Sequence, residues 1–182
     1  MIYKFYRKFF ELKDKAASRV KIWHLSFKYP NLKITGNSYI GKNCHIVCED
    51  GGAMVLHNAH INFGTFLHCS KNATFHINSS YIGMHTVIVA TKKISISNSE
   101  IAEMVVIRDQ NHKHNLTDTP IKEQGYESSS IILHKNVWVR AKATILKGVE
   151  IGKNSIIGAN AVVNKSFPNS SIIIGIPAKK IN

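Results

Sequence analysis

The chain has 182 residues, of which 44% are hydrophobic and 19% are charged, and this composition excludes an intrinsically disordered protein. Its 24 lysines and arginines against 11 acidic residues give a formal net charge of +13, which favours an anionic partner: nucleic acid, an acidic membrane face, or a phosphorylated or carboxylated small molecule. No apolar run reaches the roughly 18 residues of a membrane span, and we expect no signal peptide at the N-terminus. The three cysteines form no CxxC pair, which predicts a reduced, cytoplasmic protein with cysteines that fill the core.

The first predicted element is an amphipathic helix that begins at Ile2 and ends near Ala17. Apolar residues recur at helical spacing, with the basic residues largely on the other side: Ile2, Phe5, Tyr6, Phe9, Leu12 and Ala16. Such a helix predicts peripheral contact with an anionic inner membrane, or a cap on the open end of the domain that follows. We therefore separate an N-terminal helix or cap, residues 1–30, from a second domain, residues 31–182.

A period of six residues runs through this second domain. Six consecutive aliphatic residues each stand six positions apart: Leu133, Val139, Ile145, Ile151, Ile157 and Val163. Small or β-branched residues follow the first five of them at the fourth position: Val137, Ala143, Val149, Ser155 and Ala161. The same phase recurs earlier in the chain: Ile34-Ile40-Ile46, Val55-Ile61-Leu67, Ile82-Ile88-Ile94 and Ile101-Ile107.

Neither a helix nor an ordinary strand repeats every sixth residue, so the pattern predicts a solenoid with flat faces that are each one hexapeptide long. Three faces make a coil of about 18 residues, and the chain has room for roughly six coils. Glycines that follow inward aliphatics mark places where a side chain would be crowded: Gly41, Gly83, Gly152 and Gly158. The fold class is therefore all-β, a parallel β-helix. A polar loop over residues 108–130 and a tail over residues 168–182 interrupt the period.

The C-terminal coils carry a family resemblance. They read from His134 to Gly148 and from Val149 to Lys165, and Gly175-Ile-Pro-Ala-Lys179 follows. These segments closely resemble the hexapeptide-repeat acetyltransferases, including the galactoside, maltose, xenobiotic and bacterial polysaccharide O-acetyltransferases. The close match covers about the last 75 residues. The resemblance implies a left-handed β-helix, a homotrimer with active sites between subunits, and acetyl-coenzyme A as co-substrate.

The resemblance also implies a catalytic histidine in the loop. The family context is similar to Asp-x-Asp-Gly-His, and the matching stretch here is Ile107-Arg-Asp-Gln-Asn-His112, without the glycine. His112 is thus the expected base, with Asp109 and Asn111 as its neighbours, and His114 is the alternative. A histidine suits this role because its unperturbed pKa lies near neutral pH, so it can accept the proton of an attacking hydroxyl and return it to the departing thiolate.

The coenzyme A site is likewise carried over from the family. Trp138 matches the aromatic residue that flanks the active site, and Arg140 stands where the family usually has glycine, which would narrow the groove or add a phosphate contact. Two small residues are expected beside the pantetheine arm, Ala141 and Ala159. Three polar residues complete the expected cofactor contacts: Asn164, Lys165 and Lys179. The two lysines would meet phosphates.

These observations predict an O-acetyltransferase that acts on a sugar, with a cell-surface polysaccharide (capsule, O-antigen or sialylated glycan) or its precursor as the carbohydrate acceptor. Two alternatives stay open. One is an N-acetyltransferase of an amino sugar or antibiotic, and the other is a non-catalytic β-helix scaffold or a carbonic-anhydrase-like protein. No pair of histidines has a zinc-binding spacing, so we predict no metal. No nucleic-acid-binding motif accompanies the positive charge, so we expect no nucleic-acid partner.

Overall fold

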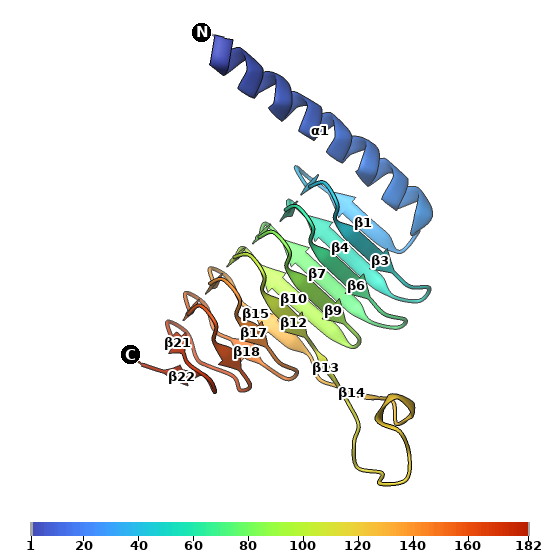
Figure 1. The fold of residues 1–182 in the computed structure, drawn as a ribbon, viewed down its shortest axis with the longest axis vertical. Helices are drawn as coiled ribbons and strands as arrows, with labels where there is room; N and C mark the ends of the chain where they lie inside the picture. Colours follow the sequence, from blue (N-terminus) through green and yellow to red (C-terminus); the bar gives the residue numbers. More distant parts are fainter. Residues whose placement is uncertain (1, 182) are drawn as a thin grey trace.

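The computed structural model describes residues 2–181, with side chains from residue 12 onward. One long helix, α1 (Ile2–Lys28), lies across one end of a solenoid that is built from three parallel sheets (Figure 1). Sheet A has six strands: β1 (Leu32–Thr35), β4 (Ala53–His57), β7 (Thr74–Asn78), β10 (Lys93–Ser97), β15 (Ile131–Leu133) and β18 (Glu150–Ile151). Sheet B has eight: β2 (Tyr39–Ile40), β5 (His60–Ile61), β8 (Tyr81–Ile82), β11 (Glu100–Ile101), β16 (Trp138–Val139), β19 (Ile156–Ile157), β21 (Ile172–Ile174) and β22 (Lys179–Lys180).

Sheet C has six strands: β3 (His45–Cys48), β6 (Phe66–Cys69), β9 (Val87–Ala90), β12 (Val106–Arg108), β17 (Thr144–Ile145) and β20 (Val162–Val163). Each turn of the chain passes from A to B to C and then starts the next coil, which gives six coils. After the sixth coil Phe167 bridges to Ile151 of sheet A, β21 joins sheet B, and β22 returns antiparallel to β21. This architecture confirms the predicted left-handed parallel β-helix.

Asparagines form many of the tight corners between the faces. Seven of them have positive φ values between 45° and 62°: Asn43, Asn58, Asn72, Asn98, Asn136, Asn154 and Asn160. Asparagine enters this left-handed conformation more readily than most residues because its short amide can bond to the local backbone. The chain can therefore turn sharply at each corner and start the next flat face.

The core is a continuous column of aliphatic side chains inside the three sheets. The six residues from Leu133 to Val163 that share the strict period are all at most 1% exposed, which confirms the prediction for the C-terminal coils. The crowding predicted at the glycines is also present. A Cβ built on Gly83 would lie 2.4 Å from the backbone carbon of Ala102, and one on Gly152 would lie 2.3 Å from the backbone nitrogen of Asn169.

The N-terminal coils depart from the simple period. Leu32 pairs with Met54 and Met54 with Phe75, so these coils take 22 and 21 residues, whereas Ile132 and Glu150 pair across 18 residues. The longer coils contain strands of four or five residues in sheets A and C.

The prediction that Val55 points inward is wrong for the same reason. Met54 and Leu56, its neighbours in the five-residue strand β4, are fully buried, and Val55 between them is only half-buried. Successive side chains of a strand point to opposite faces, so a strand of this length places two residues in the core and its central residue outside. Ile34 is also only partly buried, although it packs against the core.

The cysteines fill this core, as predicted. Cys44, Cys48 and Cys69 are buried free thiols. Burial raises the pKa of Cys69 to about 12, so its thiol stays protonated at physiological pH. The sulfur atoms therefore act as small hydrophobic groups.

The N-terminal helix is longer than predicted, since it extends to Lys28 instead of ending near Ala17. Its second half caps the first coil: Leu25 is buried, the Ile40 N–H donates to the Ser18 hydroxyl over 2.8 Å, and Lys21 Nζ donates to the Cys44 carbonyl over 2.8 Å. Of the apolar face predicted from the sequence, Ile2, Phe5, Tyr6 and Phe9 lie outside the described side chains, while Leu12 and Ala16 are exposed. Within the described residues, no helix is apolar enough over a sufficient length to cross a bilayer.

Candidate functional site

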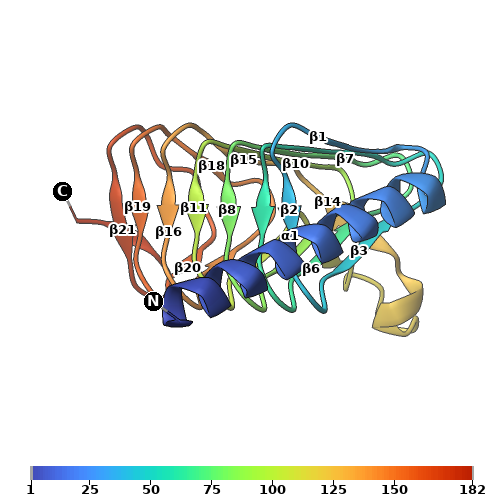
Figure 2. The same ribbon diagram turned by 90° about the horizontal axis from the view of Figure 1, so that it is seen from above.

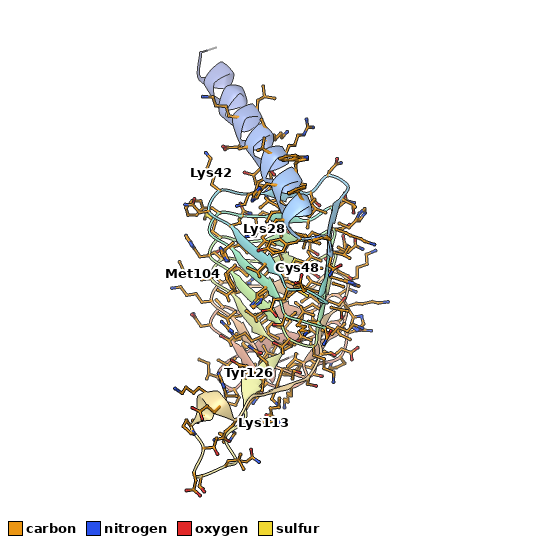
Figure 3. All side chains as sticks on the ribbon, turned by 90° about the vertical axis from the view of Figure 1, so that its right-hand side faces the viewer. Lys28, Lys42, Cys48, Met104, Lys113 and Tyr126 are labelled. Carbon is orange, nitrogen blue, oxygen red and sulfur yellow. The ribbon has the colours of Figure 1, made fainter. Side chains whose placement is uncertain are left out.

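The predicted catalytic histidine lies on a two-stranded ribbon that leaves the solenoid after β12, at the edge between sheets C and A (Figures 1 and 3). Its strands are β13 (Gln110–His112) and β14 (Tyr126–Ser128), and the short 3-10 helix η1 (Ile121–Glu123) lies between them. His112 pairs with Tyr126 across the ribbon, and their ring centroids are 4.3 Å apart. The His112 imidazole is exposed, so a second molecule can reach it.

Asp109 anchors the base of this ribbon. Its side chain is fully buried, and its carboxylate accepts three backbone N–H groups: those of Thr91 at 2.7 Å, Lys92 at 2.8 Å and Lys93 at 2.7 Å. Thr91 and Lys92 form the turn between β9 and β10, and Lys93 is the first residue of β10. The structure thus places Asp109 under the ribbon, where it holds the backbone that leads to His112, and its carboxylate is bonded to that turn.

The other predicted loop residues are exposed. Asn111 lies opposite Glu127 in the ribbon, and His114 follows in the polar segment beyond it. The Lys147 ammonium lies 2.9 Å from the Glu127 carboxylate, and this pairing lowers the pKa of Glu127. The ion pair ties the ribbon to the coil beneath it.

Tyr126 and Glu127 were missed in the sequence analysis. The family motif covers only the N-terminal half of the loop, from Ile107 to His112. The strand-like segment Tyr-Glu-Ser directly after Gly125 was the one signal for a returning strand that would bring an aromatic ring to His112.

Trp138 is not a core residue, since it is 42% exposed at the start of β16. The Arg140 guanidinium stacks on its indole, with Cζ 4.3 Å from the ring centroid. Such a cation–π contact orients both groups. Tyr81 and Glu100 stand on the neighbouring strands in register with Trp138, and the three residues line a hollow of about 460 Å³ on the outside of sheet B.

The residues predicted to meet coenzyme A lie at two different edges of sheet C. Each edge is the corner of the solenoid at which the chain turns from sheet C into a neighbouring sheet. Ala141 and Ala159 are in stacked corner turns between sheets B and C, where the Asn160 N–H donates to the Ala141 carbonyl over 3.0 Å. Lys179, in β22, follows the turn that packs on β20 at this same edge, where the Ala178 N–H donates to the Val162 carbonyl over 2.9 Å. Asn164 and Lys165 follow β20 at the opposite edge, between sheets C and A.

Within one chain these residues therefore do not form a single site. The ribbon with His112 shares one edge of sheet C with Lys165. The positions predicted to contact pantetheine share the other edge, and Trp138 stands on sheet B. The outward side chains of sheet C between the two edges include several half-buried apolar residues: Phe66, Val87, Val106 and Val162. In the described part of the chain, no three His, Cys, Asp or Glu side chains gather closely enough to hold a metal ion.

Comparison with known proteins agrees with this architecture. Residues 130–165 match the family model described as bacterial transferase hexapeptide (six repeats). In these repeats and in its fold the chain is similar to the hexapeptide-repeat acetyltransferases. It is 38% identical over 88 residues to WbbJ of Escherichia coli, which has a provisional assignment as a lipopolysaccharide biosynthesis O-acetyl transferase, and the match covers 44% of this chain. The chain spans about half the length of the curated relatives that it matches, 45% in the case of WbbJ.

Two solved structures of hexapeptide-repeat acyltransferases have the same fold. AntD, an N-acyltransferase from Bacillus cereus in complex with dTDP and coenzyme A, superposes with a TM-score of 0.69 at 22% identity, over 82% of each chain. The polySia-specific acetyltransferase NeuO superposes with a TM-score of 0.68 at 24% identity, over 82% of this chain and 70% of NeuO.

Proposed function

We propose that this hexapeptide-repeat protein transfers the acetyl group of acetyl-coenzyme A to a sugar hydroxyl, with His112 as the general base. The main support for the proposal is the exposed imidazole of His112. It lies on a ribbon that Asp109 fixes to the solenoid, and the solenoid matches the hexapeptide transferases. The structures of AntD with coenzyme A support the choice of co-substrate.

The chemistry follows from the properties of the two substrates. A sugar hydroxyl is a weak nucleophile near neutral pH, so the His112 imidazole removes its proton while the oxygen attacks the thioester carbonyl. The tetrahedral oxyanion collapses by breaking the carbon–sulfur bond, and the imidazolium then protonates the departing thiolate. The products are an acetyl ester and free coenzyme A. A backbone N–H on the rigid coil would stabilise the oxyanion.

We propose a cell-surface polysaccharide or its precursor as the acceptor. The assignment of WbbJ to lipopolysaccharide biosynthesis and the polysialic acid specificity of NeuO support a glycan acceptor. The N-acyltransferase activity of AntD makes an amino sugar the alternative.

The proposed activity is tested by release of free thiol from acetyl-coenzyme A in the presence of glycans, sugars and amino sugars. We expect turnover with a hydroxyl acceptor, and mass spectrometry of the product to locate an ester. Release with amines alone would replace the proposal with N-acetylation. No release with any acceptor, from a protein that binds acetyl-coenzyme A, would contradict it.

The lysines of the proposed cofactor site give a second prediction. Because an ammonium group is a compact charge that suits phosphate, Lys165→Ala and Lys179→Ala should each weaken acetyl-coenzyme A binding by about 1–2 kcal/mol. Isothermal titration calorimetry at low and high salt checks this, and the loss should shrink at high salt. Lys153→Ala is the matched control, since Lys153 is exposed in the turn between sheets A and B. Unchanged affinity in both variants would remove the two lysines from the site.

We also propose a homotrimer in which the site forms between subunits. The separation of the ribbon and the pantetheine positions on opposite edges of sheet C supports this, because a closed ring would bring one edge of each subunit to the other edge of its neighbour. Light scattering should give a mass near three times 20.4 kDa. Replacing the outward Phe66 and Val87 with serine should reduce both trimer content and turnover. A monomer with full activity would contradict the proposal.

For location we propose the cytoplasm, with peripheral contact at the inner face of the membrane, where cell-surface glycans are assembled. The basic composition and the N-terminal helix support this location.

A further inference from the structure

The described half of α1 has two opposite faces with different roles. One face contacts the first coil through Ser18, Lys21 and Leu25. Asp14 belongs to this side too, and its carboxylate lies 2.8 Å from the Lys42 ammonium. These contacts determine how the helix is rotated on the solenoid, so they also determine which side chains face away from it.

The face that points away from the solenoid is apolar. Leu12 is 58% exposed, Val20 67%, Trp23 72% and Phe27 82%, and Ala16 is exposed between them. Their spacing of three or four residues places them in one stripe along the helix. The Trp23 and Phe27 rings stack with centroids 6.3 Å apart. Figure 2 shows the helix lying across the end of the solenoid, with no other element over it.

From residue 12 onward, the charged side chains beside this stripe are basic. Lys15 and Arg19 are exposed beside it, and Asp14 is the one acidic residue between positions 12 and 28 of the sequence. Because Asp14 is paired with Lys42 on the inner side, the outer half of the helix presents an apolar strip with basic flanks. A second copy of this helix would bring like charges together, whereas an anionic lipid surface complements them.

We propose that this stripe, Leu12 to Phe27, docks the protein on an anionic lipid bilayer, while the opposite face of the same helix caps the solenoid. The inference names the partner for the location proposed above and rests on that part of the proposed function. Trp23 and Phe27 enter the boundary between headgroups and acyl chains, and the flanking bases meet lipid phosphates. Figure 3 shows α1 and the catalytic ribbon at opposite ends of the molecule, so docking leaves the ribbon accessible.

The test uses the full chain with vesicles of phosphatidylcholine alone and vesicles that also contain phosphatidylglycerol. In flotation assays the protein should bind the anionic vesicles, and salt should weaken the binding. The double substitution Trp23→Ser and Phe27→Ser should lower the partition coefficient at least about tenfold. The control is Leu116→Ser with Ile121→Ser, which removes two apolar side chains of 54% and 56% exposure from the loop and should bind as the native chain does.

Further readouts separate docking from its alternatives. Circular dichroism should show the same thermal transition for the Trp23/Phe27 variant, and its turnover with a water-soluble acceptor should equal that of the native chain. Absence of vesicle binding, equal binding by both double variants, or a smaller assembly in the Trp23/Phe27 variant would overturn the proposal, the last because the stripe would then join copies of the chain. Vesicle binding by a chain that transfers no acetyl group would leave the docking inference intact and refute the enzymatic proposal.

Discussion

His112→Ala is expected to lower kcat by about 10²–10⁴, while acetyl-coenzyme A affinity and thermal stability stay close to those of the native chain. The imidazole is exposed on the ribbon and contributes nothing to the solenoid core, so its removal should affect the chemical step alone. The measurement is kcat from thiol release, with calorimetry for affinity and circular dichroism for folding.

His114→Ala is the matched control for the catalytic assignment. It removes the same side chain two residues along the same segment, and we expect a mild effect because the motif match places His112 after Asp109-Gln-Asn111. If His114→Ala abolishes turnover and His112→Ala does not, the register inferred across the missing glycine is wrong. If neither variant changes kcat, the ribbon does not supply the base.

Asp109→Ala should lower the free energy of unfolding by about 3–5 kcal/mol, the largest effect on stability that we predict. The carboxylate satisfies three backbone N–H groups in a fully buried position, and removing it leaves those donors without an acceptor. For a chain of this size, the melting temperature should fall by roughly 10 °C. Urea denaturation and circular dichroism melting curves provide the measurement.

Asp118→Ala is the control for this substitution, because Asp118 is an exposed carboxylate in the same loop. It should leave stability within about 0.5 kcal/mol of the native value. A loss below about 1 kcal/mol in Asp109→Ala would contradict the anchoring role. A large loss of kcat without loss of stability would instead assign Asp109 to the chemistry.

The buried positions of the C-terminal coils could be predicted from the period of six, because this period is a local property of the sequence. In the C-terminal coils each face holds a strand of two or three residues, so Leu133, Val139 and Ile145 reach the core at constant spacing. The N-terminal coils use strands of up to five residues, and there the same reasoning assigned Val55 to the core in place of Met54 and Leu56. The length of each face depends on the neighbouring coil with which it pairs, and the period does not contain that information.

The length of the helix, the direction of its apolar face and the arrangement of the candidate site depend on tertiary contacts. The sequence by itself determined the repeat, the family resemblance and His112 as the candidate base, because these follow from residues close together in the chain. Only the folded chain decided that α1 extends to Lys28, that its apolar stripe faces away from the cap, that Asp109 anchors the ribbon, and that Tyr126 lies against His112. Each of these depends on contacts between segments that are distant in sequence, and a solenoid brings such segments together only after its coils have stacked.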